Sequence, residues 1–364
     1  VAVTCCTLLV IDVTDPAAPP LLPPSAPPEP IDDQALAGDN VFLALAGAGL
    51  QIVNVADPAR PVEIGRHDTP GTATGIAVNG THVYVADTSG GVRVFDVADP
   101  AQPQEIGFYT TPSGDNIRTV AASQHHVFAA GDHGLRVLDV SDPTAPTEVG
   151  FNNTFGYIAN MTFTADGAYL VAAGVYGVKL IDVTNPANPS EAGAWVTPER
   201  ANDVALTGDL AFVTLVSDTP NGRRDGLAVL DVATPAAPTE VGFFETVGSV
   251  EHVAVASDIA YLSLGNAGLR IMDVTDPAAP QEIAAYDTPG TAGKVFVDGD
   301  TLYIADGYDG MLILDVTDPA TPQFISAYDT DGNVMDIVVV DGIAYVARSE
   351  ERRVGKERRS RWPP

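Results

Sequence analysis

The sequence predicts an all-β protein, a β-propeller built from four-stranded antiparallel blades. One phrase recurs along the chain with a period near 42 residues, and a fixed period of this length is typical of repeat architectures. Each unit has four short strand-like runs and no helical periodicity. Each unit also has an aromatic residue at the same place in its second run. Units of about 40–45 residues with four strands are propeller blades.

The recurring phrase is an apolar run, an acidic residue, then Asp-Pro and a second proline. It reads VRVFDVADPAQP at 92–103 and LRVLDVSDPTAP at 135–146. The spacing of the first acidic position is 42 or 43 residues, except for one interval of 49. The residues at this position are Asp12, Asn54, Asp96, Asp139, Asp182, Asp231, Asp273 and Asp315. Eight copies in a ring cannot belong to one active site, so we interpret these acids as scaffold.

Residues 73–110 show how one unit is built. ATGIAVNG alternates and ends in a turn, HVYVAD and VRVFDV are β-branched and aromatic, and QEIGFYT is a more polar fourth strand. Asp-Pro-x-x-Pro ends the third strand, because aspartate forms local turns and proline fixes φ. The acid before it is expected to cap backbone N–H groups of the same turn.

One aromatic residue marks the second strand of every unit. We expect it to pack between neighbouring sheets, where a large ring buries about 150–250 Å². A ligand platform is the alternative, but a residue present in every blade favours packing. The eight residues are Phe42, Tyr84, Phe128, Tyr169, Phe212, Tyr261, Tyr303 and Tyr345.

Seven complete units begin near residues 31, 73, 115, 156, 200, 248 and 290, and two half-units remain. Residues 7–30 hold a third strand and a degraded fourth, and residues 332–347 hold a first and a second. A propeller removes its open edges by closing the ring, so we predict eight blades, the last composed of both halves. The alternative is a seven-bladed ring with frayed ends. The fourth strand of the composite blade is the weak point, because 16–30 contains eight prolines.

The runs LLVIDV, LRVLDV and LILDV resemble the LVIVD repeat, a family found mainly in bacterial and archaeal surface proteins. The resemblance covers nearly all of 7–347. It implies a β-propeller that is secreted or anchored at the surface of a bacterium or archaeon. No catalytic motif comes with the family, so the resemblance assigns no functional residue.

The last 17 residues, RSEERRVGKERRSRWPP, carry seven of the 18 basic residues and no strand pattern. They resemble the translation of a sequencing adapter, so we expect 348–364 to be a non-native tail and 1–347 to be a single propeller domain. The alternative is a basic tail that binds an anionic partner. Val1 is not an initiator, and a signal peptide, anchor or further domain would lie outside the sequence shown.

The composition limits the classes of partner. The net charge is −30, and setting the tail aside leaves 11 basic residues against 45 acidic ones. Such a charge repels nucleic acid and anionic membranes. No apolar stretch reaches the 18–20 or so residues that span a membrane. The low lysine content, three residues in all, suits a saline or extracellular setting, and a GC-rich genome is the alternative explanation. The adjacent Cys5 and Cys6 offer no disulfide framework.

The repeats disagree with one another at the start of the innermost strand, nine residues before each aromatic. This position reads Asp33, Gly75, Thr119, Asn160, Asp203, His252, Lys294 and Asp336. Oxygen donors of the kind that Ca²⁺ takes gather here and one residue earlier: Asp33, Asn160, Asn202, Asp203, Glu251 and Asp336. His252 beside Asp203, and Lys294 beside Asp336, would form charge pairs between adjacent blades. A central channel lined by solvated polar groups is the alternative to a metal site.

The second irregularity is the loop VSDTPNGRRDG at 216–226, which is longer than its counterparts. It carries Arg223 and Arg224, and arginine suits carboxylate or carbohydrate contacts. We therefore keep this loop as a candidate ligand-binding element.

Function stays open between three classes. The leading hypothesis is a non-catalytic, monomeric cell-surface or secreted propeller that acts as an interaction scaffold for an unknown protein or glycan. The first alternative is a Ca²⁺-dependent hydrolase or lactonase-like enzyme with its site at the channel mouth. The second is an extracellular glycan or peptide binder that uses loop 216–226. No GxSxG, phosphate-binding or dinucleotide-binding motif appears.

Overall fold

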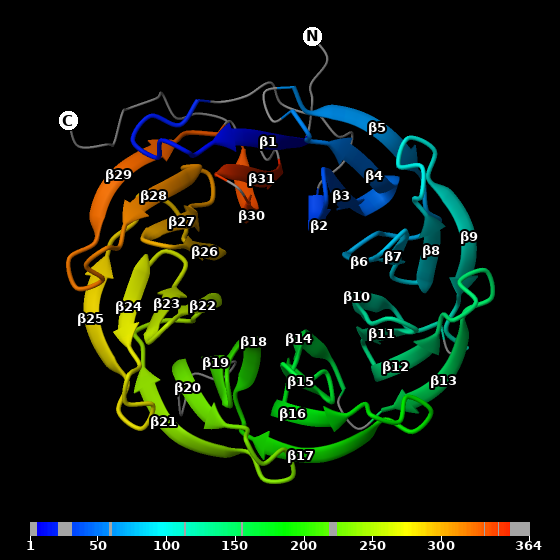
Figure 1. Ribbon diagram of the computed structural model, residues 1–364. Coiled ribbons are helices and arrows are strands. Elements are labelled where there is room, and N and C mark those ends of the chain that lie inside the picture. The colour runs from blue at the N-terminus through cyan, green and yellow to red at the C-terminus, as the bar shows by residue number, and fades with distance from the viewer. Residues whose placement is uncertain are drawn as a thin grey trace.

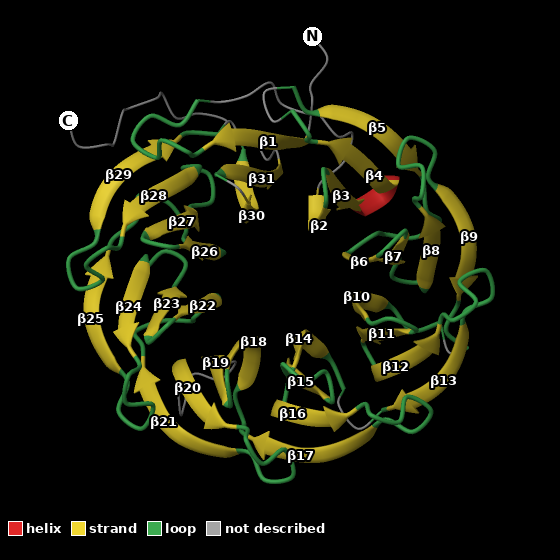
Figure 2. Cartoon of the chain, in the orientation of Figure 1, coloured by secondary structure: helices red, strands yellow, loops and turns green. Residues whose placement is uncertain are grey.

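The computed structural model describes residues 6–20, 31–57, 60–112, 114–153, 156–217, 224–330, 332–340 and 342–349. Eight antiparallel sheets are arranged around one axis (Figure 1). In seven of them the first strand in chain order lies nearest that axis, and in the eighth it is the strand Asn333–Val340. Apart from one short 3₁₀ turn, η1 (Ala46–Ala48), the described elements are strands (Figure 2). The predicted eight-bladed propeller is confirmed.

Seven blades are continuous in sequence and contain four strands each. The first three are β2 (Ile31–Ala37), β3 (Asn40–Leu45), β4 (Gly49–Asn54) and β5 (Val62–His67); β6 (Gly75–Asn79), β7 (His82–Ala86), β8 (Val92–Asp96) and β9 (Gln104–Tyr109); and β10 (Ile117–Ala122), β11 (His126–Gly131), β12 (Gly134–Asp139) and β13 (Thr147–Asn152).

The fourth and fifth blades are β14 (Ile158–Phe163), β15 (Tyr169–Gly174), β16 (Gly177–Asp182) and β17 (Ser190–Val196); and β18 (Arg200–Thr207), β19 (Leu210–Val216), β20 (Gly226–Asp231) and β21 (Thr239–Glu245). The sixth and seventh are β22 (His252–Ala256), β23 (Ile259–Ser263), β24 (Leu269–Asp273) and β25 (Gln281–Tyr286); and β26 (Val295–Asp298), β27 (Thr301–Ala305), β28 (Met311–Asp315) and β29 (Gln323–Tyr328).

The eighth blade joins the two ends of the chain. It contains β30 (Asn333–Val340), β31 (Ile343–Ser349) and β1 (Cys6–Asp12), with β1 antiparallel to β31. The Asp12 N–H donates to the Pro20 carbonyl at 3.2 Å, which is the register at which Asp96 meets Gln104 in the second blade. This bond lies where the predicted fourth strand would begin. The rest of that segment, 21–30, lies outside the described residues, as do 350–364 of the predicted tail.

The core is a set of apolar layers between neighbouring blades. Phe42, for example, packs against Ile76 and Val83 of the next blade. Both faces of each sheet are covered in this way, which explains the nearly continuous Val, Ile, Leu and Ala in the second and third strands. The predicted packing of the aromatic residues is confirmed at seven of the eight positions, where the rings are at most 5% exposed.

The prediction for Tyr169 is wrong. Tyr169 pairs with Asp182, as Leu210 pairs with Asp231 in the next blade. It is therefore only half-buried, at the start of β15. Val171 takes the buried aromatic position. The physical reason is a longer hairpin between β14 and β15, which shifts the aromatic two residues away from its counterparts.

The Asp-Pro turns are structural, as predicted. At every repeat the first acidic or amide side chain accepts the backbone N–H two residues later, at 2.8–3.3 Å. Five of the turns also pack on a glycine of the blade before them. A Cβ on Gly107 of β9 would lie 2.3 Å from the Pro143 carbonyl oxygen in the next blade's turn. Glycine is required there because backbone approaches backbone.

Candidate functional site

The irregular positions lie at one level around the axis, as the pairing register shows. In every blade the irregular residue at the start of the innermost strand is opposite the same place in the second strand. Asp33, for example, is opposite Ala44, and Asp203 is opposite Thr214. We call it the axial position. In the fifth to eighth blades and the first it carries an ionisable side chain, and in the second to fourth blades Gly75, Thr119 and Asn160.

Two axial aspartates hold the next blade by its backbone. Asp33 Oδ2 accepts the N–H of Ile76 at 2.9 Å, and Asp203 Oδ2 accepts the N–H of Val253 at 3.1 Å. In both cases the donor is the residue directly after the axial position of the following blade. Asp203 Oδ1 also accepts from the Asn160 side-chain amide of the preceding blade. These carboxylates therefore join blades.

The axial aspartates that join blades are also shielded from solvent. Asp203 is only 5% exposed. Burial raises the pKa of Asp33 to about 6, although the Ile76 N–H and the charge of Lys294 oppose the shift. The charge of Asp336 acts in the same direction as burial.

His252 continues the same pattern in the sixth blade. Its Nδ1 lies 3.5 Å from the Val295 nitrogen of the next blade, and its Nε2 lies 3.4 Å from Asp203 Oδ2. A neutral ring that accepts at Nδ1 and carries its proton on Nε2 satisfies both neighbours. Burial lowers the pKa of His252, with a further contribution from Lys294, and the carboxylate of Asp203 opposes the shift.

Lys294 and Asp336 form the second predicted charge pair. Lys294 Nζ lies 3.1 Å from Asp336 Oδ1, and Asp336 is only 8% exposed. Burial alone would lower the pKa of Lys294, but the carboxylates of Asp336 and Asp33 outweigh it and raise the pKa. The predicted charge pair of Lys294 with Asp336 is confirmed, and His252 lies beside Asp203 as predicted, but as a neutral ring and not as a charged partner.

The remaining predicted calcium ligands serve similar contacts or face solvent. The Asn202 side-chain amide donates to the Glu251 carbonyl at 3.0 Å, and the Glu251 carboxylate is exposed. Within the described ranges, no three His, Cys, Asp or Glu side chains are grouped so that they could hold a metal ion. The Ca²⁺ site thus stays a prediction, with most of its proposed donors already engaged between blades.

Arg224, at the end of the long loop, is held by its own blade. Its guanidinium forms a bidentate pair with Glu240 and lies 4.0 Å from the ring centre of Phe243. In other blades an arginine on the third strand pairs with a glutamate and lies over an aromatic ring, as Arg93 does with Glu105 and Phe108. The fifth blade has Ala228 at that strand position, so the loop supplies the missing cation. Arg223 lies outside the described residues.

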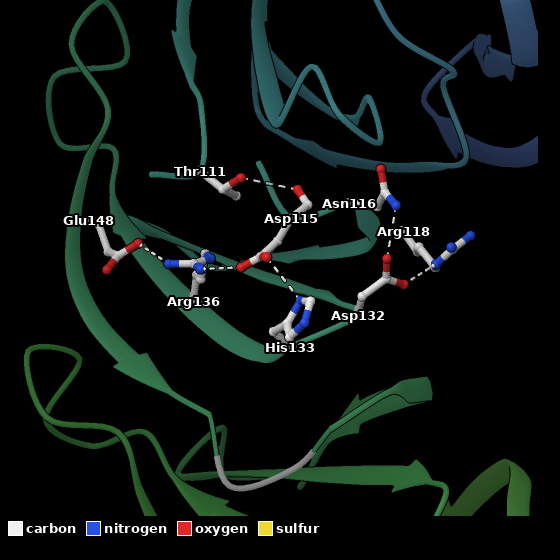
Figure 3. Close-up of polar contacts among 8 residues, drawn as sticks. All are labelled: Thr111, Asp115, Asn116, Arg118, Asp132, His133, Arg136 and Glu148. Atoms are coloured by element: carbon white, nitrogen blue, oxygen red, sulfur yellow. Dashed lines mark hydrogen bonds and ion pairs between the residues drawn. The ribbon is translucent and has the colours of Figure 1, made fainter. Parts of the chain in front are cut away.

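A polar network in the third blade was not predicted. Arg136 contacts Asp115 and Glu148, each at 2.7 Å, and His133 contacts Asp115 at 2.9 Å (Figure 3). Beside it, Arg118 and Asn116 both bind Asp132. The arginine that recurs in the third-strand phrase, as in VRVFDV and LRVLDV, was the available signal. The role of this arginine could not be predicted, because its partner is a glutamate on the fourth strand that only the fold brings near.

Sequence comparison identifies the repeats. The LVIVD repeat matches residues 32–69, 70–111, 115–154, 199–246, 247–288 and 289–330. These segments make up more than half of the chain, so the protein belongs to the LVIVD repeat family. No curated protein matches it in sequence.

Solved structures share the architecture at low identity. The computationally designed protein Ika8 has a TM-score of 0.71 at 12% identity, with 88% of this chain and 94% of that chain covered. Saccharomyces cerevisiae Sqt1 has a TM-score of 0.70 at 10% identity, with 89% and 97% covered. Chaetomium thermophilum Sqt1, bound to the N-terminus of the ribosomal protein L10, has a TM-score of 0.64 at 14% identity, with 85% and 94% covered. At such identities the likeness establishes the fold alone.

In the part of the chain that the structure describes, no helix has the length and apolar character needed to cross a membrane.

Proposed function

We propose that this protein is a non-catalytic interaction scaffold, a rigid ring that presents its connecting loops to a partner. The observation that carries the proposal is the use of the axial side chains. Asp33, Asp203 and His252 each face a backbone N–H of the next blade, and Lys294 pairs with Asp336. Groups engaged in this way stabilise the ring, and they are not free to act on a substrate. A scaffold role is also in keeping with Sqt1, a similar fold that was solved with a bound peptide terminus.

The same proposal includes a location for the protein, at the cell surface. The family resemblance and the acidic, lysine-poor composition support a place outside the cytoplasm, at the surface of a bacterium or archaeon. Surface biotinylation of intact cells of the source organism, followed by detection of this chain, tests it. Labelling only after lysis would contradict the proposal.

The hydrolase alternative is tested directly by activity. Purified protein is assayed on chromogenic ester, lactone and phosphoester substrates with and without Ca²⁺, beside Asp203→Ala and the control Asp258→Ala at an exposed position. We expect no turnover that depends on Asp203. Turnover that requires Ca²⁺ and is lost only in Asp203→Ala would replace the scaffold by the enzyme.

A further inference from the structure

Most cations of the described chain are neutralised within the ring. Each of eight side chains forms an ion pair with a carboxylate: Arg66, Arg93, Arg118, Arg136, Lys179, Arg224, Arg270 and Lys294. The net charge of −30 is therefore carried by acids that have no cation beside them. Any cation that keeps no carboxylate is an exception.

Arg200 is such an exception, and its position is specific. It opens β18 in the fifth blade, and its Nε is buried with no hydrogen-bond acceptor. The neighbouring Glu199 is engaged by the Thr197 hydroxyl and does not pair with it. Arg200 as a residue stays partly exposed, so the accessible part of its guanidinium can bind a carboxylate supplied by a ligand. Arg60 also lacks a carboxylate partner, but it is exposed in an Asp-Pro turn.

Two of the most exposed apolar side chains of the described residues lie on the fourth blade, directly before the strand that Arg200 opens. Val196, four residues before Arg200, is 72% exposed, and Tyr176 is 62% exposed. The two are neighbours, because Val196 pairs with Gly177 and the Thr197 N–H donates to the Tyr176 carbonyl at 3.4 Å. Val247, on the connection from the fifth to the sixth blade, is 91% exposed. Exposed apolar groups beside polar ones mark interaction sites.

We propose that Tyr176, Val196 and Arg200, the docking rim, bind an extended peptide segment of a partner that carries a carboxylate beside apolar side chains. The proposal rests on the scaffold function above and names the class of its partner. Arginine binds carboxylates in a bidentate geometry, and valine and tyrosine bury the flanking side chains. The acidic remainder of the ring repels a carboxylate, so Arg200, a cation beside exposed apolar side chains, fixes where the segment lies.

The test uses a probe pentapeptide that alternates valine and glutamate, labelled with fluorescein. Matched peptides carry glutamine or lysine in place of glutamate. Anisotropy is measured in about 0.5 M NaCl, which screens the field of the ring to a few ångströms. The change in Trp195 fluorescence, in the Trp362→Phe background, gives a second readout from the strand that carries Val196.

We expect saturable binding of the glutamate peptide and weaker binding of the other two. Arg200→Gln should weaken binding at least about tenfold, as expected for loss of a charge-assisted pair. Val196→Asn should weaken it as well. Arg60→Gln makes the same charge change elsewhere and should bind like the wild type. Phe108→Ser, at a residue 56% exposed on another blade, is the matched apolar control.

Three outcomes would overturn the docking rim: no saturable binding, equal binding to Arg200→Gln, or equal binding of the lysine peptide. Binding of a neutral glycan that is lost in Val196→Asn but kept in Arg200→Gln would assign the docking rim to a different ligand. None of these results touches the scaffold proposal, which fails separately if hydrolysis depends on Asp203.

Discussion

At the scale of single residues, two aspartates at the same place in the repeat can have different charged neighbours. Asp87 and Asp306 occupy the same place in the second and seventh blades, and neither is exposed. Each accepts a glycine N–H from the connection before its blade, Gly71 at 2.9 Å and Gly290 at 2.8 Å. Arg93 lies 3.4 Å from Asp87, but Leu312 takes the place of that arginine beside Asp306. Burial consequently raises the pKa of Asp306 to about 6.

Asp306→Asn should stabilise the ring at neutral pH and leave it unchanged near pH 4. The folded-state pKa of about 6 lies above the ordinary value of 3.8, so the folded protein binds the proton more tightly than the unfolded chain. The stabilising contribution is therefore present below about pH 4 and is lost as the pH rises through 6. We expect a gain on the order of 2 kcal/mol in the free energy of unfolding at pH 7.5. Urea unfolding at both pH values measures it.

Asp87→Asn is the matched control, with the opposite expected sign. Removing that charge leaves Arg93 without one of its two carboxylates, so the variant should be neutral or less stable at pH 7.5. Equal behaviour of the two variants would show that the neighbouring arginine does not decide the effect.

At the scale of elements, the first five blades are each fixed to the next by an Asp-Pro turn and a close backbone approach. Gly65, Gly107, Gly150, Gly193 and Gly242 lie against the next blade's turn. The sixth and seventh blades have Ala284 and Ser326 at this place, and the Ser326 hydroxyl donates to the Pro16 carbonyl of the composite blade. This side-chain bond to the N-terminal segment adds to the pairing of β1 with β31 that closes the ring.

Gly107→Ala should lower the free energy of unfolding by about 2 kcal/mol, because the added Cβ would meet the Pro143 carbonyl at 2.3 Å and backbone must move. The reverse change, Ala284→Gly, tests the same position where the packing already accepts a methyl group. It should cost less than about 1 kcal/mol. Chemical denaturation of both variants gives the comparison, and equal losses would mean that the turn does not press on Gly107.

The strands could be predicted from the sequence because the same pattern recurs eight times. The period and the Asp-Pro phrase predicted the strands, the turns and the composite blade. Tyr169 was misplaced because two extra hairpin residues before it shift the register without changing the phrase. The axial charge pairs were predicted because the repeat fixes which positions meet between blades. Contacts that depend on side-chain direction, such as Arg224 with Glu240 or Asp33 with the Ile76 N–H, could not be predicted from the sequence.

At the scale of the whole molecule, charge opposes the compact ring. The net charge is −30, and most described cations are already paired with their own carboxylates. The excess acids therefore repel one another with little local compensation.

The melting temperature should accordingly rise by several degrees between about 10 mM and 1 M NaCl, since the screening length falls to about 3 Å at 1 M. KCl at equal ionic strength should give the same rise, because screening does not depend on the identity of the ion. A melting temperature that stays constant over this range would contradict self-repulsion as a limit on stability.

The central claim is that the axial side chains join the blades and do not hold a catalytic metal. Its most direct test is the melting temperature of the wild type and Asp203→Ala in EDTA, in Ca²⁺ and in Mg²⁺. The account predicts that Asp203→Ala melts lower in all three, because Val253 and Asn160 lose their acceptor. It also predicts that Ca²⁺ and Mg²⁺ shift both proteins equally. A Ca²⁺-specific rise in the wild type that disappears in Asp203→Ala would contradict it and place a calcium ion at the axial position.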